Sequence, residues 1–266
     1  MTGTRVLSAL CIAALLLLAV LWLPPFWSVA ALTLILLAAA WEWAAFISAR
    51  SAPRLLFLAL LAGLCALWWQ VSSSGQGLRL LLWSALGWWC VISGWIIARR
   101  RCNRTLVALA GLLGLSFAWL ALARMRMDWQ LGHYAVLYAL LIVWVADSGA
   151  YFAGRQWGRA KLAPTVSPGK TWAGLWGGLA ACALLALGVS YLRALPLLPL
   201  LAVTLVAALY SVAGDLVESL AKRHAGVKDS GNLIPGHGGV LDRFDSLLAA
   251  APVLMLGVVL LPELHG

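Results

Sequence analysis

The sequence is poor in charged residues, and poorest in acidic ones. Only 11% of its 266 residues are charged and nine are Asp or Glu, whereas 64% are hydrophobic. A soluble domain of this length carries about a quarter charged residues and about half apolar ones. This shortage leaves too little polar surface to cover a water-facing globule, which excludes a soluble protein. Apolar runs long enough to cross about 30 Å of hydrocarbon recur from end to end instead.

Period-two alternation of polar and apolar residues is also missing, as are paired cysteines. The apolar runs are continuous stretches of Leu, Ala, Val and Trp, as in residues 12–23. Barrel strands alternate over about ten residues, whereas a helix satisfies its own backbone hydrogen bonds and can be apolar all round. The five cysteines form no CxxC pair, which excludes a disulfide framework and a zinc site. The composition therefore indicates an all-α, polytopic integral membrane protein.

The apolar runs predict about nine transmembrane helices in a single membrane domain that covers residues 1–266. We expect these helices at about 6–23, 26–47, 55–71, 78–98, 105–123, 133–154, 171–192, 195–216 and 245–262. Residues 1 to about 130 are predicted to form a scaffold, and residues from about 131 to 266 to carry the catalytic helices and cytoplasmic loops.

The basic residues are distributed unevenly between the two ends of these spans. With a cytoplasmic N-terminus, nine spans place fifteen of the nineteen Lys and Arg residues inside and leave Arg79, Arg124, Arg126 and Arg193 outside. Cytoplasmic loops of membrane proteins are enriched in Lys and Arg. The bias therefore predicts a multi-pass protein of the cell inner membrane with its active site facing the cytoplasm. A nucleic-acid partner is excluded, because no DNA- or RNA-binding motif accompanies the net charge of +10.

Five of the nine acidic residues fall between positions 215 and 245. On a helix, Asp215 and Glu218 share one face because they lie three residues apart, and the same spacing joins Asp242 and Asp245. Ionisable groups inside or at the ends of spans are functional candidates by default. Converging carboxylates with no Cys and few His suit Mg²⁺ rather than Zn²⁺. The acids therefore predict a magnesium site at the cytoplasmic ends of the last two spans.

Basic and hydroxyl side chains lie among these acids. Ser219 and Lys222 fall on the helix face of Asp215, and the other nearby basic residues are Lys170, Arg223, Lys228 and Arg243. A divalent ion held by carboxylates and surrounded by Lys and Arg is the arrangement that phosphoryl chemistry requires. The alternative is a solvated loop with pairwise salt bridges.

Two other acidic residues interrupt apolar spans. Asp147 begins a second polar segment, residues 147–174, near the cytoplasmic end of the sixth predicted span. Glu42 lies about two turns from Arg50 and is interpreted as its ion-pair partner or as a side chain that reaches the membrane surface.

The C-terminal polar segment resembles a known family signature. Its pattern is Ser219-x2-Lys222-Arg223-x4-Lys228-Asp229-x-Gly231-x2-Ile234-Pro235-x-His237-Gly238-Gly239-Val240-x-Asp242-Arg243-Phe244-Asp245. This pattern over residues 219–245 resembles the signature of the phosphatidate cytidylyltransferases, also called CDP-diacylglycerol synthases. The resemblance extends upstream to residues 147–172. The resemblance implies an all-helical membrane enzyme of phospholipid biosynthesis, often a homodimer, that uses Mg²⁺ and leaves a second cation open. Its reaction would convert CTP and phosphatidic acid to CDP-diacylglycerol and pyrophosphate.

The residues and the resemblance together give each candidate a role. The expected catalytic residues are Asp215, Asp242, Lys222, Arg223 and Asp245, and the expected metal ligands are Asp215, Asp242 and Glu218. The expected substrate-binding residues are Lys170, Ser167, Ser219, Lys228, Asp229, His237, Gly238, Gly239, Arg243 and Asp147. The expected partners are CTP, phosphatidic acid, membrane lipids and a second copy of the chain.

Two other functions are considered from the sequence. A CTP-dependent lipid kinase of the polyprenol type would transfer the γ-phosphate and release CDP instead of pyrophosphate. A secondary transporter would use the intramembrane acids as an ion site. Transporter sites lie near the midplane in broken helices, usually between repeated halves, whereas here the polar residues gather on one side and no repeat is visible.

Overall fold

The structure consists of long apolar helices. The computed structural model describes residues 14–98, 102–128, 132–233 and 238–264. Within these ranges, eight helices are long and apolar enough to cross a membrane, the last one counted from Leu241 to Leu260. They are α2 (Pro25–Ile47), α3 (Ser51–Val71), α4 (Gly75–Ile97), α5 (Arg104–Asp128), α6 (Gly132–Trp157), α7 (Trp172–Arg193), α8 (Leu197–His224), and the pair α9 (Leu241–Phe244) and α10 (Leu247–Leu260). The predicted all-α, multi-pass membrane fold is confirmed.

The first predicted span, 6–23, is described only in part. Residues 14–21 are helical, and the residues before 14 lie outside the described ranges. The ninth span and the cytoplasmic N-terminus therefore stay predictions. The other spans coincide with helices, and the largest difference is at α8, a helix of 28 residues that continues past the predicted end at 216.

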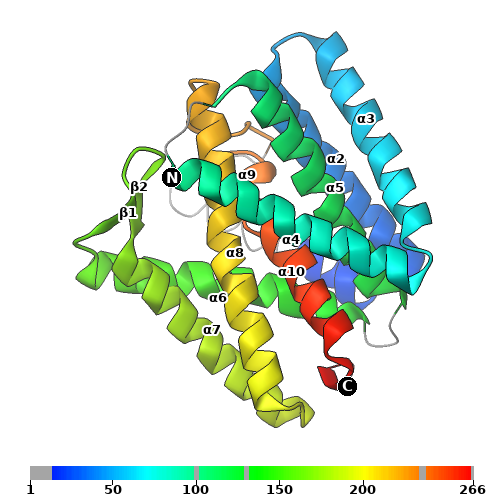
Figure 1. Cartoon of the computed structure of the whole chain (residues 1–266), viewed down its shortest axis with the longest axis vertical. Helices are drawn as coiled ribbons and strands as arrows, with labels where there is room; N and C mark the ends of the chain where they lie inside the picture. The colour runs from blue at the N-terminus through cyan, green and yellow to red at the C-terminus, as the bar shows by residue number, and fades with distance from the viewer. Residues whose placement is uncertain (1–13, 99–101, 129–131, 234–237, 265–266) are drawn as a thin grey trace.

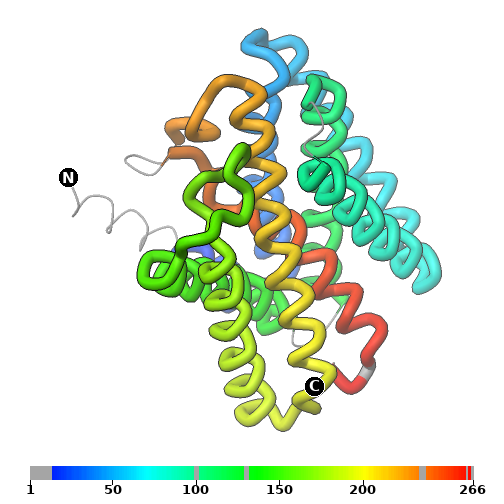
Figure 2. The backbone as a smooth tube through the Cα atoms, turned by 60° about the vertical axis from the view of Figure 1, so that its left-hand side comes forward, coloured from blue at the N-terminus to red at the C-terminus, as the bar shows by residue number. Residues whose placement is uncertain are grey.

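Helices α8 and α10 run through the middle of the molecule, with α2 to α5 on one side and α6 and α7 on the other (Figure 1, Figure 2). Helix α10 packs against α8, α5 and α4, and every residue from Leu247 to Leu256 is buried. A helix that is apolar all round is typical of such a central position. The central pair thus joins the two groups of helices.

Glycines bring α6 and α7 into close contact. A Cβ atom on Gly149 of α6 would lie 2.7 Å from the carbonyl oxygen of Gly177, and one on Gly178 would lie 2.8 Å from that of Ala146. Small residues at helix interfaces allow membrane helices to pack backbone against backbone. This packing fixes α6, which carries Asp147, against α7, which begins two residues after Lys170.

A short β-hairpin joins α6 to α7. Its strands are β1 (Lys161–Ala163) and β2 (Ser167–Thr171), which pair antiparallel. The Oγ1 atom of Thr171 accepts a hydrogen bond from the backbone N–H of Gly174 at 3.1 Å and so caps α7. The sequence shows no strand pattern in this segment. A three-residue strand is too short to show the alternation that identifies strands in a sequence.

Two arginines near the C-terminal end of α5 bind neighbouring segments of the chain by hydrogen bonds. At the end opposite the hairpin, Arg124 donates hydrogen bonds to Ser72 Oγ and to the carbonyl oxygen of Trp69, both at 2.9 Å. Arg126 donates to the carbonyl oxygen of Leu23 at 2.6 Å. Both arginines are buried. Two of the four basic residues predicted on the outer side therefore serve packing.

Candidate functional site

Three carboxylates from α8 and from the residue after α9 lie together, and we call them the acidic cluster. It consists of Asp215, Glu218 and Asp245, and one ligand oxygen of each lies within 4.8 Å of the others. Glu218 is completely buried, and its Oε1 has no hydrogen-bond partner in the described part of the chain. Buried carboxylates need a compensating cation or proton, because the desolvation of unpaired charge is costly. An all-oxygen set suits Mg²⁺.

The acidic cluster depends on a close approach between α8 and the chain after α9. A Cβ atom on Gly214 would lie 2.5 Å from the carbonyl oxygen of Asp245 and 3.3 Å from the Cα of Ser246. Glycine at position 214 therefore allows the backbone of Asp245 to reach α8 beside Asp215.

Lys222 joins the acidic cluster to Asp242. Its Nζ atom lies 2.8 Å from Glu218 Oε2 and 2.8 Å from Asp242 Oδ1. The other oxygen of Asp242, Oδ2, accepts backbone N–H groups of Gly239 at 2.8 Å and Ser230 at 3.0 Å. Both oxygens of Asp242 are thus engaged by donors within the protein.

This geometry bears on the predicted ligand set of Asp215, Asp242 and Glu218. The carboxylates that each place one oxygen within 4.8 Å of the others are Asp215, Glu218 and Asp245. Asp242 as a ligand stays a prediction, and the distances favour Asp245 in its place. The sequence could not decide between Asp242 and Asp245 as the ligand. It places both acids at the start of the last span, and it does not show the break between α9, which ends at Phe244, and α10, which begins at Leu247.

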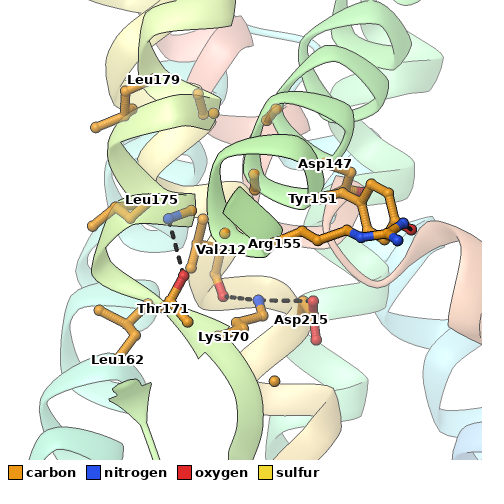
Figure 3. A pocket seen from close by; sticks show the side chains of 17 residues that line it. Asp147, Tyr151, Arg155, Leu162, Lys170, Thr171, Leu175, Leu179, Val212 and Asp215 are labelled. Carbon is orange, nitrogen blue, oxygen red and sulfur yellow. Dashed lines mark hydrogen bonds and ion pairs between the residues drawn. The ribbon is translucent and has the colours of Figure 1, made fainter. Parts of the chain in front are cut away.

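A cavity of about 390 Å³ adjoins the acidic cluster. Helices α6, α7 and α8 and the hairpin line it, and Asp215 stands in its wall (Figure 3). The Nζ atom of Lys170 lies 2.7 Å from Asp215 Oδ2 and donates to the carbonyl oxygen of Val212 at 3.3 Å. The charged lining residues are Asp147, Arg155, Lys170 and Asp215, and the apolar ones include Leu162, Leu175, Leu179 and Val212. One wall therefore suits an anion and the other suits hydrocarbon.

Three further predicted residues, Ser219, Arg223 and Arg243, lie on α8 and α9. The shared helix face is confirmed, since Ser219 Oγ donates to Asp215 Oδ1 at 3.2 Å. Arg223 is exposed and donates to the carbonyl oxygen of Val166 in the hairpin turn at 3.5 Å. Arg243, on α9, acts electrostatically on Asp147.

Four further predicted residues lie on the hairpin or on the segment between α8 and α9. Ser167 is the first residue of β2, three positions before Lys170. Lys228 and Asp229 are exposed, and no contact brings them to the acidic cluster among the residues described. Gly238 has a positive φ of 81° and precedes the N–H that binds Asp242. His237 lies outside the described residues.

Sequence reasoning missed several residues at this site. Arg155 and Tyr151 line the cavity, where Arg155 Nη1 donates to the Tyr151 hydroxyl at 3.1 Å. Their signal was available, because both lie on the polar segment that begins with Asp147. The interpretation of Glu42 as an ion-pair partner of Arg50, or as a side chain that reaches the membrane surface, is wrong. Glu42 is buried and accepts hydrogen bonds from Ser230 and Leu241, with no ion pair to Arg50, although the structure describes both residues.

Comparisons with known proteins point to a single family. The family model described as "Cytidylyltransferase family" matches residues 3–261. The chain is 37% identical to a phosphatidate cytidylyltransferase of Haemophilus influenzae over 95% of its own length and 96% of that protein. It is 39% identical to one of Pseudomonas aeruginosa over 80% of its length and 81% of that protein. A phosphatidate cytidylyltransferase of Bacillus subtilis is 47% identical over 47% of each chain.

Proposed function

The chain belongs to the cytidylyltransferase family and is a nucleotidyltransferase, and we propose that it transfers the cytidylyl group of CTP to phosphatidic acid. One observation carries the proposal from the structure. Asp215 belongs both to the acidic cluster and to the wall of the amphipathic cavity. A centre that can hold a divalent cation therefore adjoins a site with room for both a phosphate and an acyl chain.

We propose that Asp215, Glu218 and Asp245 would hold Mg²⁺. Two features support this fit: the set offers only oxygen ligands, and Glu218 Oε1 is buried without a hydrogen-bond donor among the described residues. Bound there, Mg²⁺ would supply charge neutralisation for the phosphates that react. The sequence prediction of a second cation stays open.

The triphosphate of CTP would bind on the side of Lys222, Arg223 and Lys228. In the reaction, a phosphate oxygen of phosphatidic acid forms a bond to the α-phosphorus of CTP. The bond from that phosphorus to the bridging oxygen breaks, and pyrophosphate leaves with the electron pair. Lys222 donates to the departing phosphates, where negative charge develops. The attacking phosphate is already an anion at neutral pH, so it needs alignment rather than a strong base.

Phosphatidic acid would occupy the cavity. Lys170 and Arg155 line it and can bind the phosphate, while Leu175 and Leu179 line the part that suits an acyl chain. Exposed aromatic residues of α6 and α7, among them Tyr151 and Trp172, belong to the same end of the bundle. Such residues are typical of the headgroup layer of a membrane.

We further propose that this end faces the cytoplasm in the cell inner membrane. Support comes from the basic residues that the connectivity of the helices brings to it, since cytoplasmic loops favour Lys and Arg. A homodimer remains part of the proposal, because the family resemblance implies it.

The test is a product assay with purified protein, CTP, labelled phosphatidic acid and Mg²⁺ in detergent micelles. We expect labelled CDP-diacylglycerol and an equal amount of pyrophosphate, formed only when the divalent cation is present. Release of CDP with a phosphorylated lipid would instead identify the kinase alternative. No turnover of either kind in folded protein would overturn the proposal.

The Gly214→Ala variant tests the close approach that forms the acidic cluster. The added methyl group would meet the carbonyl oxygen of Asp245 and push that residue away from α8. Misplacing a reacting or charge-stabilising group by about 1 Å can lower a rate about a hundredfold, and we expect a loss of this size. The measurement is CDP-diacylglycerol formation per folded protein. The matched control is Gly188→Ala on α7, where a Cβ atom meets nothing within 4 Å; equal activity of both variants would contradict the prediction.

A further inference from the structure

Glu42 is a buried acid on α2, in the part of the chain predicted as scaffold. Only 4% of the residue is exposed. Its Oε2 accepts hydrogen bonds from Ser230 Oγ at 3.0 Å and from the backbone N–H of Leu241 at 2.8 Å. Its Oε1 is buried and has no hydrogen-bond partner among the residues that the structure describes. A buried carboxylate is costly to desolvate, so a role in packing alone would be served better by an uncharged side chain.

Two glycines beside these contacts, Gly231 and Gly239, leave room for the Glu42 carboxylate. A Cβ atom on Gly231 would collide with Glu42 Oε1, and one on Gly239 would collide with Oε2 and with Ser230 Oγ. Both positions are therefore limited to glycine as long as Glu42 is in place. The side chain of Glu42 thus holds Ser230 and Leu241, which lie 188 and 199 positions further along the chain.

Ser230 and Gly239 also orient Asp242. The backbone N–H groups of Ser230 and Gly239 bind Asp242 Oδ2 at 3.0 and 2.8 Å, and Asp242 Oδ1 lies 2.8 Å from Lys222 Nζ. Ser230 is the direct link, because its hydroxyl binds Glu42 while its N–H binds Asp242. Leu241, the second donor to Glu42, immediately precedes Asp242 in the chain.

We propose that Glu42 is a positioning residue for nucleotide binding: it anchors Ser230 and Leu241 so that Asp242 is held against Lys222. This inference rests on the proposed function, in which Lys222 binds the phosphates of CTP. Glu42 acts here as a hydrogen-bond acceptor from two donors at one oxygen. A glutamine oxygen can accept the same two bonds.

The experiment compares Glu42→Ala, Glu42→Gln and Ser230→Ala in CDP-diacylglycerol synthesis at varied CTP. Hydrogen bonds to a charged acceptor are stronger than those between neutral groups. We therefore expect Glu42→Ala, which removes two of them, to raise the KM for CTP about tenfold or more. We expect Glu42→Gln to stay within about threefold of the unmodified enzyme, and Ser230→Ala to raise the KM less than Glu42→Ala. A destabilised protein would lower the active fraction and the apparent kcat without moving the KM, so the KM separates positioning from a merely structural role.

Controls keep the outcomes distinct. Glu263→Ala removes an exposed acid beyond α10 and is expected to change neither constant. If Glu42→Ala does not fold, the KM of Ser230→Ala decides. An unchanged KM for CTP in folded Glu42→Ala, or in Ser230→Ala where Glu42→Ala does not fold, overturns the inference. An equal loss in Glu42→Gln and Glu42→Ala also overturns it, because the negative charge and not the hydrogen bonds would then be required. If the unmodified protein makes no CDP-diacylglycerol, it is the proposed function that fails.

Discussion

The Asp215→Asn variant is expected to lose about three powers of ten in turnover, because charge stabilisation at a metal-assisted phosphoryl centre is worth several kcal/mol. Asparagine keeps the size of the side chain and removes its charge. The change would weaken the acidic cluster and at the same time release Lys170, whose Nζ atom lies 2.7 Å from Asp215. The measurement is CDP-diacylglycerol formation by purified protein over a titration of Mg²⁺.

The control for this variant is Asp128→Asn. Asp128 lies at the opposite end of the bundle, where it pairs with Arg124 at 3.3 Å, and we expect normal turnover. Near-normal turnover of Asp215→Asn at saturating Mg²⁺ would show that Asp215 holds no essential cation. A parallel comparison separates the two remaining candidates. Asp245→Asn is expected to raise the Mg²⁺ requirement, whereas Asp242→Asn is expected to raise the CTP requirement.

Replacing Lys222 by alanine is expected to lower kcat/KM for CTP by about two to three powers of ten, as the loss of one charge-stabilising donor commonly does. Lys222 has two roles that the variant removes together. It separates Glu218 from Asp242, each 2.8 Å from its Nζ atom, and it would meet the triphosphate. We expect a raised KM for CTP together with a lower kcat, and partial recovery in Lys222→Arg, which keeps the charge with a different geometry.

Lys161→Ala is the matched control for Lys222. Lys161 is an exposed lysine on β1 and lies outside the acidic cluster and the residues that line the cavity. Its removal is expected to leave the CTP dependence unchanged. A Lys222→Ala variant with the CTP dependence of the control would remove Lys222 from the nucleotide site.

Features that repeat along one helix could be predicted from the sequence. The span positions followed from apolar length, and the shared face of Asp215, Glu218, Ser219 and Lys222 followed from their spacing. The contacts of Ser219 with Asp215 and of Lys222 with Glu218, both four residues apart, confirm that face. Such contacts depend on helix geometry alone, so no knowledge of tertiary structure was needed.

Features that depend on packing between distant segments could not be predicted. Glu42 is one example, because nothing in its neighbourhood on α2 identifies Ser230 as its partner. The choice between Asp242 and Asp245 is another. It depends on the break between α9 and α10 and on the missing side chain at Gly214, which admits the backbone of Asp245. Neither feature leaves a periodic signal.

The length of α8 sets the depth at which the reaction would occur. With 28 residues at 1.5 Å each, the helix is about 42 Å long, some 12 Å more than the hydrocarbon layer. Counted from its first residue, Asp215 comes after about 27 Å, which would be close to the headgroup layer for a helix that enters the hydrocarbon at that residue and runs along the bilayer normal. Lys222 comes about 10 Å later, within reach of water. A dissolved nucleotide and an anchored lipid could therefore meet at the boundary between their two solvents, and neither would have to leave its own.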